Sequence, residues 1–323
     1  MVKYWILILT VITFWGCNNY KADKETQENF PELTGKYLGQ KEPGLKPEIF
    51  APNIVSTGMA EINAAFSPDF KEFYYSIRMP NGQLVIMAMI YDGTKWSEPE
   101  VASFSGKYSD ADPFVTYDGN WLYFISRRPI MPSGAAITDW DIWRARRDGY
   151  KWSEPERLPN GINSDADETY PSLTKDGKLY FSSSRIGKNN KDIFSAERLE
   201  DSFKNPVRLN DNVNSHWEGD IFISPNEDYM IFASHGRDTG SGLYLTFNQE
   251  GQWSIPQRMS GEINVTGREF SPIVSPDGKY FFFTSNQPLK TNELPEKLTY
   301  KLIKDDFTNH IITLREEKLI SIG

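Results

Sequence analysis

Short runs of apolar residues, broken by polar turns, dominate this chain and return in a regular order. The runs LYFIS, LYFSSS, MIFAS and YFFFTS are rich in aromatic and β-branched residues, a composition typical of β-strands. Each is preceded by a turn such as SPDG or TKDG, in which Pro or Asp fixes the backbone and Gly accepts positive φ. The pattern therefore predicts a fold built from strands and tight turns.

One unit of thirteen residues occurs five times, with starts 49, 58, 50 and 51 residues apart. A period near 50 is typical of a supersecondary unit that is repeated so that neighbours bury each other's faces. The copies are FSPDFKEFYYSIR from Phe66, VTYDGNWLYFISR from Val115, LTKDGKLYFSSSR from Leu173, ISPNEDYMIFASH from Ile223 and VSPDGKYFFFTSN from Val274.

Each copy is followed by further strand signals. A third strand is expected at residues 84–90, 141–146, 192–198, 242–247 and 298–303. A Trp or Phe and then a proline open a fourth, outer strand, where proline is tolerated at a sheet edge, at Pro99, Pro155, Pro206 and Pro256. Four strands per repeat predict an all-β, five-bladed β-propeller of four-stranded blades; a sixth, degenerate blade is the alternative. The Trp and Phe residues are expected to pack between blades.

The two ends of the repeat region complement each other. Residues 46–61 align with the outer-strand segment 154–168 but have no strands before them, whereas the fifth copy lacks an outer strand. We expect residues 47–57 to complete the last blade and close the ring, which removes its exposed edges. The propeller is thus predicted over residues 47–310, with a C-terminal tail over 311–323.

The N-terminus has the pattern of a secretion signal. Lys3 precedes an apolar run over residues 4–15, which is short for a membrane span, and Gly16 and Cys17 follow. A lone cysteine after glycine resembles a bacterial lipobox, so residues 1–16 are predicted to be a lipoprotein signal peptide and Cys17 the lipid anchor. Ordinary secretion, with Cys17 incidental, is the alternative. The polar residues 17–46 are predicted to be a flexible tether.

Composition narrows the class of partner. The formal net charge is −9 and the pI about 5.1, and no basic stripe is present that could neutralise phosphates. Nucleic acid is therefore not an expected partner. Cys17 is the only cysteine, so no disulfide framework is expected. We expect a monomer that meets the membrane through the lipid anchor alone.

The strings SPDG, LYFSS and DIF resemble the WD-like propeller repeats of bacterial periplasmic and outer-membrane lipoproteins, a class that includes the periplasmic propeller of the Tol system. The resemblance covers about residues 47–304. It implies a propeller and an envelope location, at the outer membrane and facing the periplasm or the cell surface. It does not imply an activity, because such propellers include scaffolds, sugar-binding proteins and polysaccharide-cleaving enzymes. The chain departs from the family pattern at His235, where arginine is usual.

Two columns of charged residues are predicted on one face of the ring, because the start of the first strand and the end of the second lie together in an antiparallel blade. An acid comes eight residues before each turn Asp or Asn, at Glu61, Asp110, Glu168, Glu218 and Glu269. The thirteenth residue of each unit gives the second column: Arg78, Arg127, Arg185, His235 and Asn286. Either the arginines pair with the acids and hold the ring together, or they face the channel and bind a carboxylate or sulfate. On the second reading Arg78, Arg127, Arg185, Arg237, Glu168 and Glu218 bind the substrate.

The fourth copy breaks the pattern of the others. His235 replaces the column arginine, and His216 lies two residues before Glu218. Histidine titrates near neutral pH and is the commonest general base, although a surface histidine that stands in for arginine remains the alternative. We predict His235, His216 and Tyr170 as catalytic residues. Elimination at a uronic acid needs a cation that neutralises the carboxylate and a base that removes the adjacent proton, and this set could supply both.

The hypothesis for function is a lipid-anchored propeller that acts on anionic, uronate-containing oligosaccharides during polysaccharide degradation, as a lyase or dehydratase. The alternative is a non-catalytic outer-membrane propeller that serves as a scaffold or as a glycan- or protein-binding module. No cofactor and no metal are predicted. The acids of residues 109–113 and 163–168 leave calcium open, but they lack the alternating ligand pattern of a known calcium loop.

Overall fold

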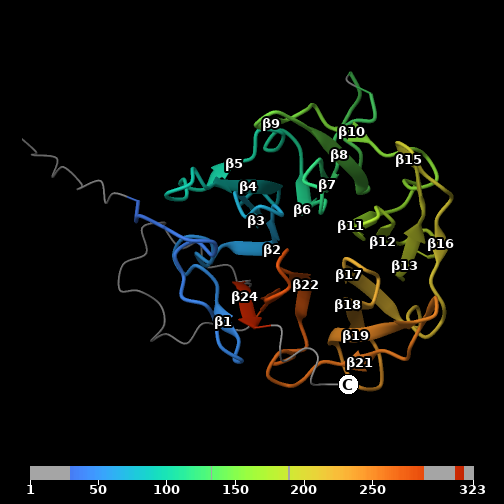
Figure 1. Ribbon diagram of the computed structural model, residues 1–323. Coiled ribbons are helices and arrows are strands. Elements are labelled where there is room, and N and C mark those ends of the chain that lie inside the picture. Colours follow the sequence, from blue (N-terminus) through green and yellow to red (C-terminus); the bar gives the residue numbers. More distant parts are fainter. Residues whose placement is uncertain (1–29, 132, 188–189, 287–309, 316–323) are drawn as a thin grey trace, which may run out of the picture. The chain divides into compact units, whose positions relative to one another are not determined.

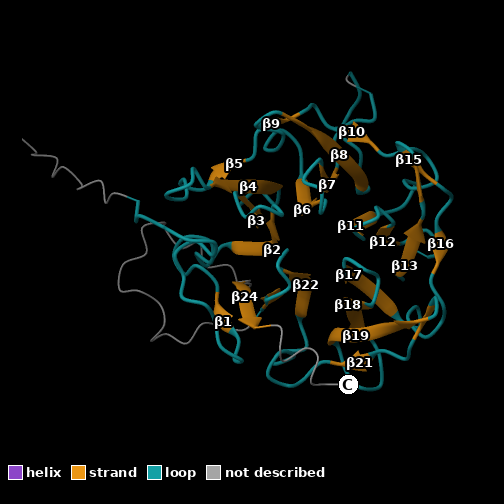
Figure 2. Cartoon of the chain, in the orientation of Figure 1, coloured by secondary structure: helices purple, strands orange, loops and turns teal. Residues whose placement is uncertain are grey.

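The computed structural model describes residues 30–131, 133–187, 190–286 and 310–315, and its regular elements in these ranges are all strands (Figure 2). The chain divides into two compact units, Met1–Pro31 and Glu32–Gly323, and the fold described below belongs to the second. The predicted signal peptide, residues 1–16, and Cys17 lie outside the described residues. Within those residues we find no helix of the length and apolarity that crossing a membrane requires.

The strands form five sheets of four or five strands and one two-stranded ribbon. The first sheet contains β2 (Ala60–Phe66), β3 (Glu72–Arg78), β4 (Leu84–Ile90) and β5 (Glu100–Val101). The second contains β6 (Asp110–Val115), β7 (Trp121–Ser126), β8 (Asp141–Asp148), β9 (Lys151–Trp152) and β10 (Glu156–Arg157). The third contains β11 (Glu168–Leu173), β12 (Leu179–Ser183), β13 (Asp192–Ala196) and β16 (Val207–Arg208), and the ribbon β14 (Arg198–Leu199) and β15 (Ser202–Phe203) follows β13 in the chain.

The fourth sheet contains β17 (Trp217–Ile223), β18 (Tyr229–His235), β19 (Gly242–Gln249), β20 (Gln252–Trp253) and β21 (Gln257–Arg258). The fifth contains β22 (Glu269–Val274), β23 (Tyr280–Ser285), β24 (His310–Arg315) and β1 (Glu48–Ile49). Each copy of the thirteen-residue repeat therefore supplies the first turn and second strand of one sheet.

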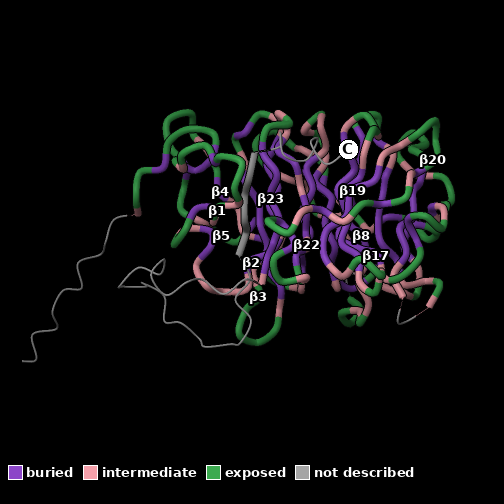
Figure 3. The backbone as a smooth tube through the Cα atoms, turned by 90° about the horizontal axis from the view of Figure 1, so that it is seen from below, coloured by how far each residue is buried: buried purple, intermediate pink, exposed green. Residues whose placement is uncertain are grey.

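The first strands of the sheets stand around a common centre, with the later strands outside them (Figure 1). They contact one another in a circle, from β2 to β6, β11, β17, β22 and back to β2. A closed circle of antiparallel four-stranded sheets is a β-propeller, so the predicted all-β propeller of four-stranded blades is confirmed. The buried residues lie along the strands, and the exposed ones lie mainly in the loops at the two faces (Figure 3).

The N-terminal segment closes the ring. Strand β1 pairs antiparallel with β24, with Glu48 opposite Thr313, and so becomes the outer strand of the fifth sheet. The prediction that residues 47–57 complete the last blade is thus confirmed. Its third strand was misplaced: residues 298–303 lie outside the described ranges, and His310–Arg315 pairs with the whole length of β23. The segment HIITLR has the β-branched composition of a strand, so the sheet extends beyond residue 310, where a tail was predicted.

A segment that was predicted to be part of a tether is packed. Leu33, Tyr37 and Leu38 are buried, and Leu38 is only 2% exposed. The Tyr37 ring contacts Phe66, Phe70, Tyr280 and Phe282, which joins the first and fifth sheets at their turn-bearing face. The segment from Leu33 to Leu38 is therefore part of the folded body, because its apolar side chains gain more from burial than a flexible chain would lose.

Aromatic residues of the outer strands pack between neighbouring sheets, as predicted. Trp152 donates its indole N–H to the Tyr74 hydroxyl at 2.7 Å, and Trp253 meets the Tyr180 ring at 6.2 Å. Each contact joins an outer strand to the second strand of the preceding sheet. These contacts supply apolar burial at positions that are far apart in the sequence.

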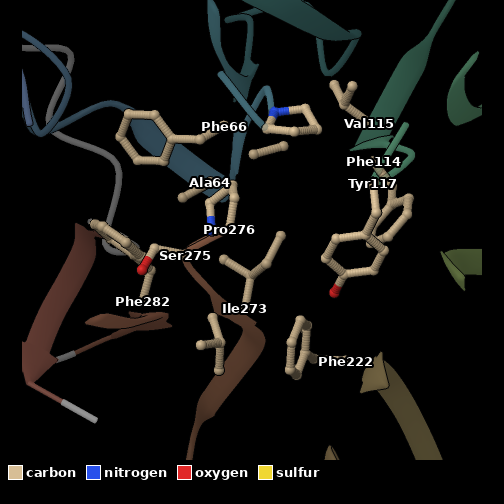
Figure 4. A pocket seen from close by; sticks show the side chains of 13 residues that line it. Ala64, Phe66, Phe114, Val115, Tyr117, Phe222, Ile273, Ser275, Pro276 and Phe282 are labelled. Atoms are coloured by element: carbon tan, nitrogen blue, oxygen red, sulfur yellow. The ribbon is translucent and has the colours of Figure 1, made fainter. Parts of the chain in front are cut away.

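The central channel is filled at its turn-bearing end. The side chains of Phe114, Tyr117, Phe222 and Ile273 approach one another across the axis (Figure 4). The space left there is about 20 Å³, enough for a single water molecule. Any ligand of the channel must therefore enter from the opposite face, which we call the mouth.

Candidate functional site

Each first strand begins at the mouth with, or next to, a fully buried acid. Glu61, Asp110, Glu168, Glu218 and Glu269 are all 0% exposed. A buried carboxylate needs hydrogen-bond partners, and a serine at the end of the second strand supplies one in several blades. Ser126 donates to Asp110 at 2.6 Å, and Ser183 donates to Glu168 at 2.6 Å. Burial nevertheless raises the pKa of Asp110, Glu168 and Glu218.

Three of these acids also hold an arginine. Arg128 lies 2.8 Å from Asp110, Arg185 lies 3.1 Å from Glu168, and Arg237 lies 2.8 Å from Glu218. Each guanidinium also donates to the carbonyl of a residue in the segment that links two sheets, namely Phe104, Ile162 or Val213. These arginines therefore join the mouth end of the second, third and fourth blades to the linker before each, which agrees in these three blades with the alternative that arginines hold the ring together.

This arrangement corrects part of the predicted substrate-binding set. Glu168 and Glu218 have no exposed surface with which to touch a ligand. In the second blade the pairing arginine is Arg128 instead of Arg127, and in the fourth it is Arg237 instead of the column residue. The position of an arginine in the repeat does not determine whether it pairs with the buried acid, because the path of the loop after the second strand decides where a long side chain reaches.

In the part of the chain that the structure describes, the remaining column residues form no ion pair with these acids. The Arg127 guanidinium lies 4.4 Å from the centre of the Trp140 ring, and Arg78 is exposed at the end of β3. A ligand-binding role for Arg78 and Arg127 stays a prediction. His235 and Asn286, the last two members of the column, both line a cavity at the mouth.

This cavity has a volume of about 600 Å³ and is lined by residues of the third, fourth and fifth sheets. Such a volume is within the usual range for small-molecule sites. Its chemistry comes from Tyr170, Lys191, Trp217, Asp220, His235, Arg268, Phe270 and Asn286. The structure thus brings two of the three predicted catalytic residues, His235 and Tyr170, to one cavity.

His235 ends strand β18 and stands directly opposite Trp217 of β17. The two rings are 4.8 Å apart and tilted by 44°. Burial lowers the pKa of His235, so the imidazole is neutral at pH 7 and can accept a proton. His216 does not line the cavity: it is exposed, and its Nδ1 lies 3.0 Å from the Ser215 hydroxyl. The geometry therefore favours His235 over His216 as the base.

The inner end of the cavity is a polar ring that the sequence reasoning identified only at Tyr170. At the same position of each first strand a residue has positive φ, where the pairing to the second strand shifts register. These residues are Asn63, Asp112, Tyr170, Asp220 and Ser271. They lie two residues after the acid of each blade, so extending the acid column by two positions would have found them.

Contacts between blades connect this ring. Asp112 accepts the backbone N–H of Tyr170, and Asp220 accepts that of Ser271, each at 3.3 Å. The Tyr170 hydroxyl hydrogen-bonds to Asp220 and lies 3.4 Å from the Ser271 hydroxyl. Burial, and then repulsion by Asp220, raise the pKa of Asp112 to about 8, and burial raises that of Asp220 to about 6. Burial also raises the pKa of Tyr170, which therefore keeps its proton at neutral pH.

A repeated asparagine was also missed. The Asn163 side chain accepts the N–H of Ile142 at 2.8 Å and donates to the carbonyls of Ile142 and Leu158. Asn214 and Asn264 make the same three bonds in the next two blades. Their spacing matches the repeat period and was the available signal. These residues brace the third strand and do not face a ligand.

The described ranges contain no group of three or more His, Cys, Asp or Glu side chains close enough to hold a metal ion. Within the two acidic loops, the carboxylates of Asp110 and Glu168 already bond to arginine and serine side chains, and the Asn163 side chain bonds to backbone groups. A calcium site there stays a prediction without structural support.

Neither a protein family model nor a curated protein matches the chain. Similar solved structures include a TolB-type protein of Agrobacterium tumefaciens, with 17% identity, a TM-score of 0.47 and coverage of 70% of each chain. TolB from Acinetobacter baumannii has 15% identity and a TM-score of 0.49 over 80% of this chain, which spans 57% of that protein. An alpha-L-arabinofuranosidase from Lactobacillus brevis has 14% identity and a TM-score of 0.47, over 82% of this chain and 92% of the enzyme. All three TM-scores are below 0.5 and all three identities are 17% or less, so none of these similarities indicates a family or an activity.

Proposed function

We propose that the protein binds an anionic sugar in the mouth cavity and acts on a uronate unit by elimination. The observation that carries the proposal is the composition of the cavity wall. It combines a neutral histidine, a protonated tyrosine and two cationic side chains, His235, Tyr170, Lys191 and Arg268.

The charge of the cavity suits an anionic ligand. Lys191 and Arg268 are the cations in its lining, and Asp220 is the carboxylate. The lining is therefore positive overall, although the whole chain has a formal charge of −9. A cation beside the carboxylate of a uronate makes the proton on the adjacent carbon more acidic, because it stabilises the negative charge that develops there.

The two uncharged residues suit the two proton transfers of an elimination. His235 removes the proton from the carbon next to the carboxylate, and the electron pair of that bond forms the new carbon–carbon double bond. The bond to the leaving oxygen breaks, and Tyr170 supplies that oxygen with a proton. Tyr170 suits the acid role because burial keeps it protonated. Trp217 and Phe270 add aromatic surface that can lie against a sugar ring.

The location follows the same proposal. We infer that Cys17 is lipidated and holds a closed five-bladed ring at the bacterial outer membrane, facing the periplasm or the cell surface. The packed segment that begins at Leu33 contacts the turn-bearing face, through Tyr37.

The test is incubation of the purified protein with uronate-containing oligosaccharides. Elimination from an intact sugar creates ultraviolet absorbance, and dehydration of an unsaturated sugar shifts or removes it with loss of water in the mass spectrum. We expect His235→Ala to lose at least about a hundredfold in rate, as removal of a general base does, and His216→Ala to lose less than tenfold. No change in any acidic glycan, or full activity of His235→Ala, would contradict the proposal. Binding without turnover would instead support the non-catalytic glycan-binding module.

A further inference from the structure

His235 is held in an unusual way for a candidate base. Among the described residues, neither ring nitrogen of His235 has a hydrogen-bond partner, whereas a catalytic histidine is commonly oriented by a carboxylate or carbonyl on one nitrogen. Its ring contact is with the Trp217 indole, at 4.8 Å. The orientation of the imidazole therefore depends on an aromatic neighbour.

The Trp217 ring packs against its own strand, β17. A Cβ atom added to Gly219 would lie 2.8 Å from Cη2 and 3.1 Å from Cζ3 of Trp217, so the indole lies directly over this glycine. Any larger residue at 219 would push the ring away. The Lys191 ammonium lies 5.7 Å from the centre of the same indole, within reach of a cation–π interaction. The position of the Trp217 ring is thus set by Gly219 of β17, by His235 of β18 and by Lys191 before β13.

We propose that Trp217, seated on Gly219, is the positioning residue for His235, and that it fixes the imidazole at the cavity by aromatic contact alone. Both ring nitrogens then remain available to the ligand. This inference rests on the proposed role of His235 as the base. It explains why the fourth blade has a histidine opposite a tryptophan, where the first blade has Arg78 opposite Ala60.

The contact has a measurable consequence for the titration of His235. Burial, to which the indole contributes, is the cause of its lowered pKa. The other charged or titratable groups of the cavity wall are Tyr170, Lys191, Asp220 and Arg268, and Arg237 and Glu218 form the adjacent ion pair. Replacing the indole by a smaller side chain admits water and returns the pKa of His235 towards its ordinary value of 6.5.

The experiment is an NMR titration of the histidine ring signals in the full chain. His216→Gln and His310→Gln variants assign the signals of the three histidines. Trp217→Leu is expected to raise the pKa of His235 by on the order of half a unit or more. Trp217→Phe, which keeps an aromatic ring, is expected to restore most of the wild-type value, and Gly219→Ala to act like Trp217→Leu if it folds. Phe270→Leu removes another aromatic ring from the cavity wall without a ring contact to His235, and is the control.

The outcomes separate this inference from the proposed function, because the titration needs no substrate. An unchanged His235 pKa in Trp217→Leu, or an equal shift in Phe270→Leu, would overturn the positioning role. Addition of a uronate disaccharide to the wild type tests the function instead: it should perturb the His235 signals, and no perturbation would count against the cavity as a uronate site. Where turnover is found, the acidic limb of its pH profile should move with the pKa in Trp217→Leu.

Discussion

The carboxyl group of Asp112 is predicted to make the protein less stable as the pH rises from 5 to 7. Asp112 is 4% exposed, and its pKa is raised from 3.8 to about 8 by burial and by Asp220. Between these values the unfolded chain releases the proton while the folded protein keeps it. The folded state then binds more protons than the unfolded state, so the free energy of unfolding falls with increasing pH.

The magnitude follows from the width of the pH window. Each pH unit between the two pKa values costs about 1.4 kcal/mol, so the two units from pH 5 to pH 7 cost about 2.7 kcal/mol. Asp112→Asn removes the ionisation and keeps an oxygen that can accept the N–H of Tyr170. The variant should therefore gain about 2.7 kcal/mol on the wild type over this window.

Urea unfolding followed by tryptophan fluorescence, at pH 5, 6 and 7, measures this difference. Asp92→Asn is the matched control: Asp92 is exposed and its pKa is lowered to about 2, so it is ionised in both states throughout the window. Parallel stability curves for the wild type and Asp112→Asn would show that Asp112 is already ionised in the folded protein, and the reasoning would be refuted.

Three further predictions concern the contacts that hold the blades. Arg237→Ala leaves the buried Glu218 without its cation, which should lower the free energy of unfolding in urea by about 3–5 kcal/mol. If Arg237→Ala cost no more than Arg268→Ala, which removes an exposed arginine, this reasoning would be contradicted. Asn214→Ala leaves backbone groups of β13 unpaired and should cost about 1–3 kcal/mol, more than Asn212→Ala, with hydrogen exchange of the Ile193 amide as a second measurement. Leu38→Ala should lower thermal stability by about 2–5 kcal/mol, because this side chain is buried, and an unchanged melting temperature would show that the segment is not part of the folded body.

Much of the fold could be predicted because the repeat carries local information. The turns, the aromatic strands and the outer proline positions each depend on residues within one blade, and five in-frame copies fix the order of the strands. The same reasoning misplaced the third strand of the fifth sheet. Residues 298–303 and 310–315 both have strand composition, and the choice between them depends on pairing to β23, which is a tertiary contact.

The candidate site was predicted less completely, for a related reason. His235 stood out because it departs from the pattern of its column, and Tyr170 because it lies two residues after Glu168; the structure places both at one cavity. Nothing in the sequence identified four other residues of the site, because they come together only across neighbouring blades: Asp112, Asp220, Lys191 and Trp217. The exchange of Arg127 for Arg128 likewise depends on the path of a loop, which a repeat alignment does not describe.

The sequence alone thus determined that the chain forms a propeller closed by its N-terminal strand, since these features follow from periodicity, strand composition and the missing outer strand of the last copy. Only the tertiary structure decided which charged residues form the ion pairs that hold the ring and which remain free to line the mouth. A buried carboxylate takes whichever arginine its loop can deliver, and the blades converge on the axis only after they pack. The fourth blade keeps His235 at the cavity because Arg237, two residues later, already satisfies Glu218.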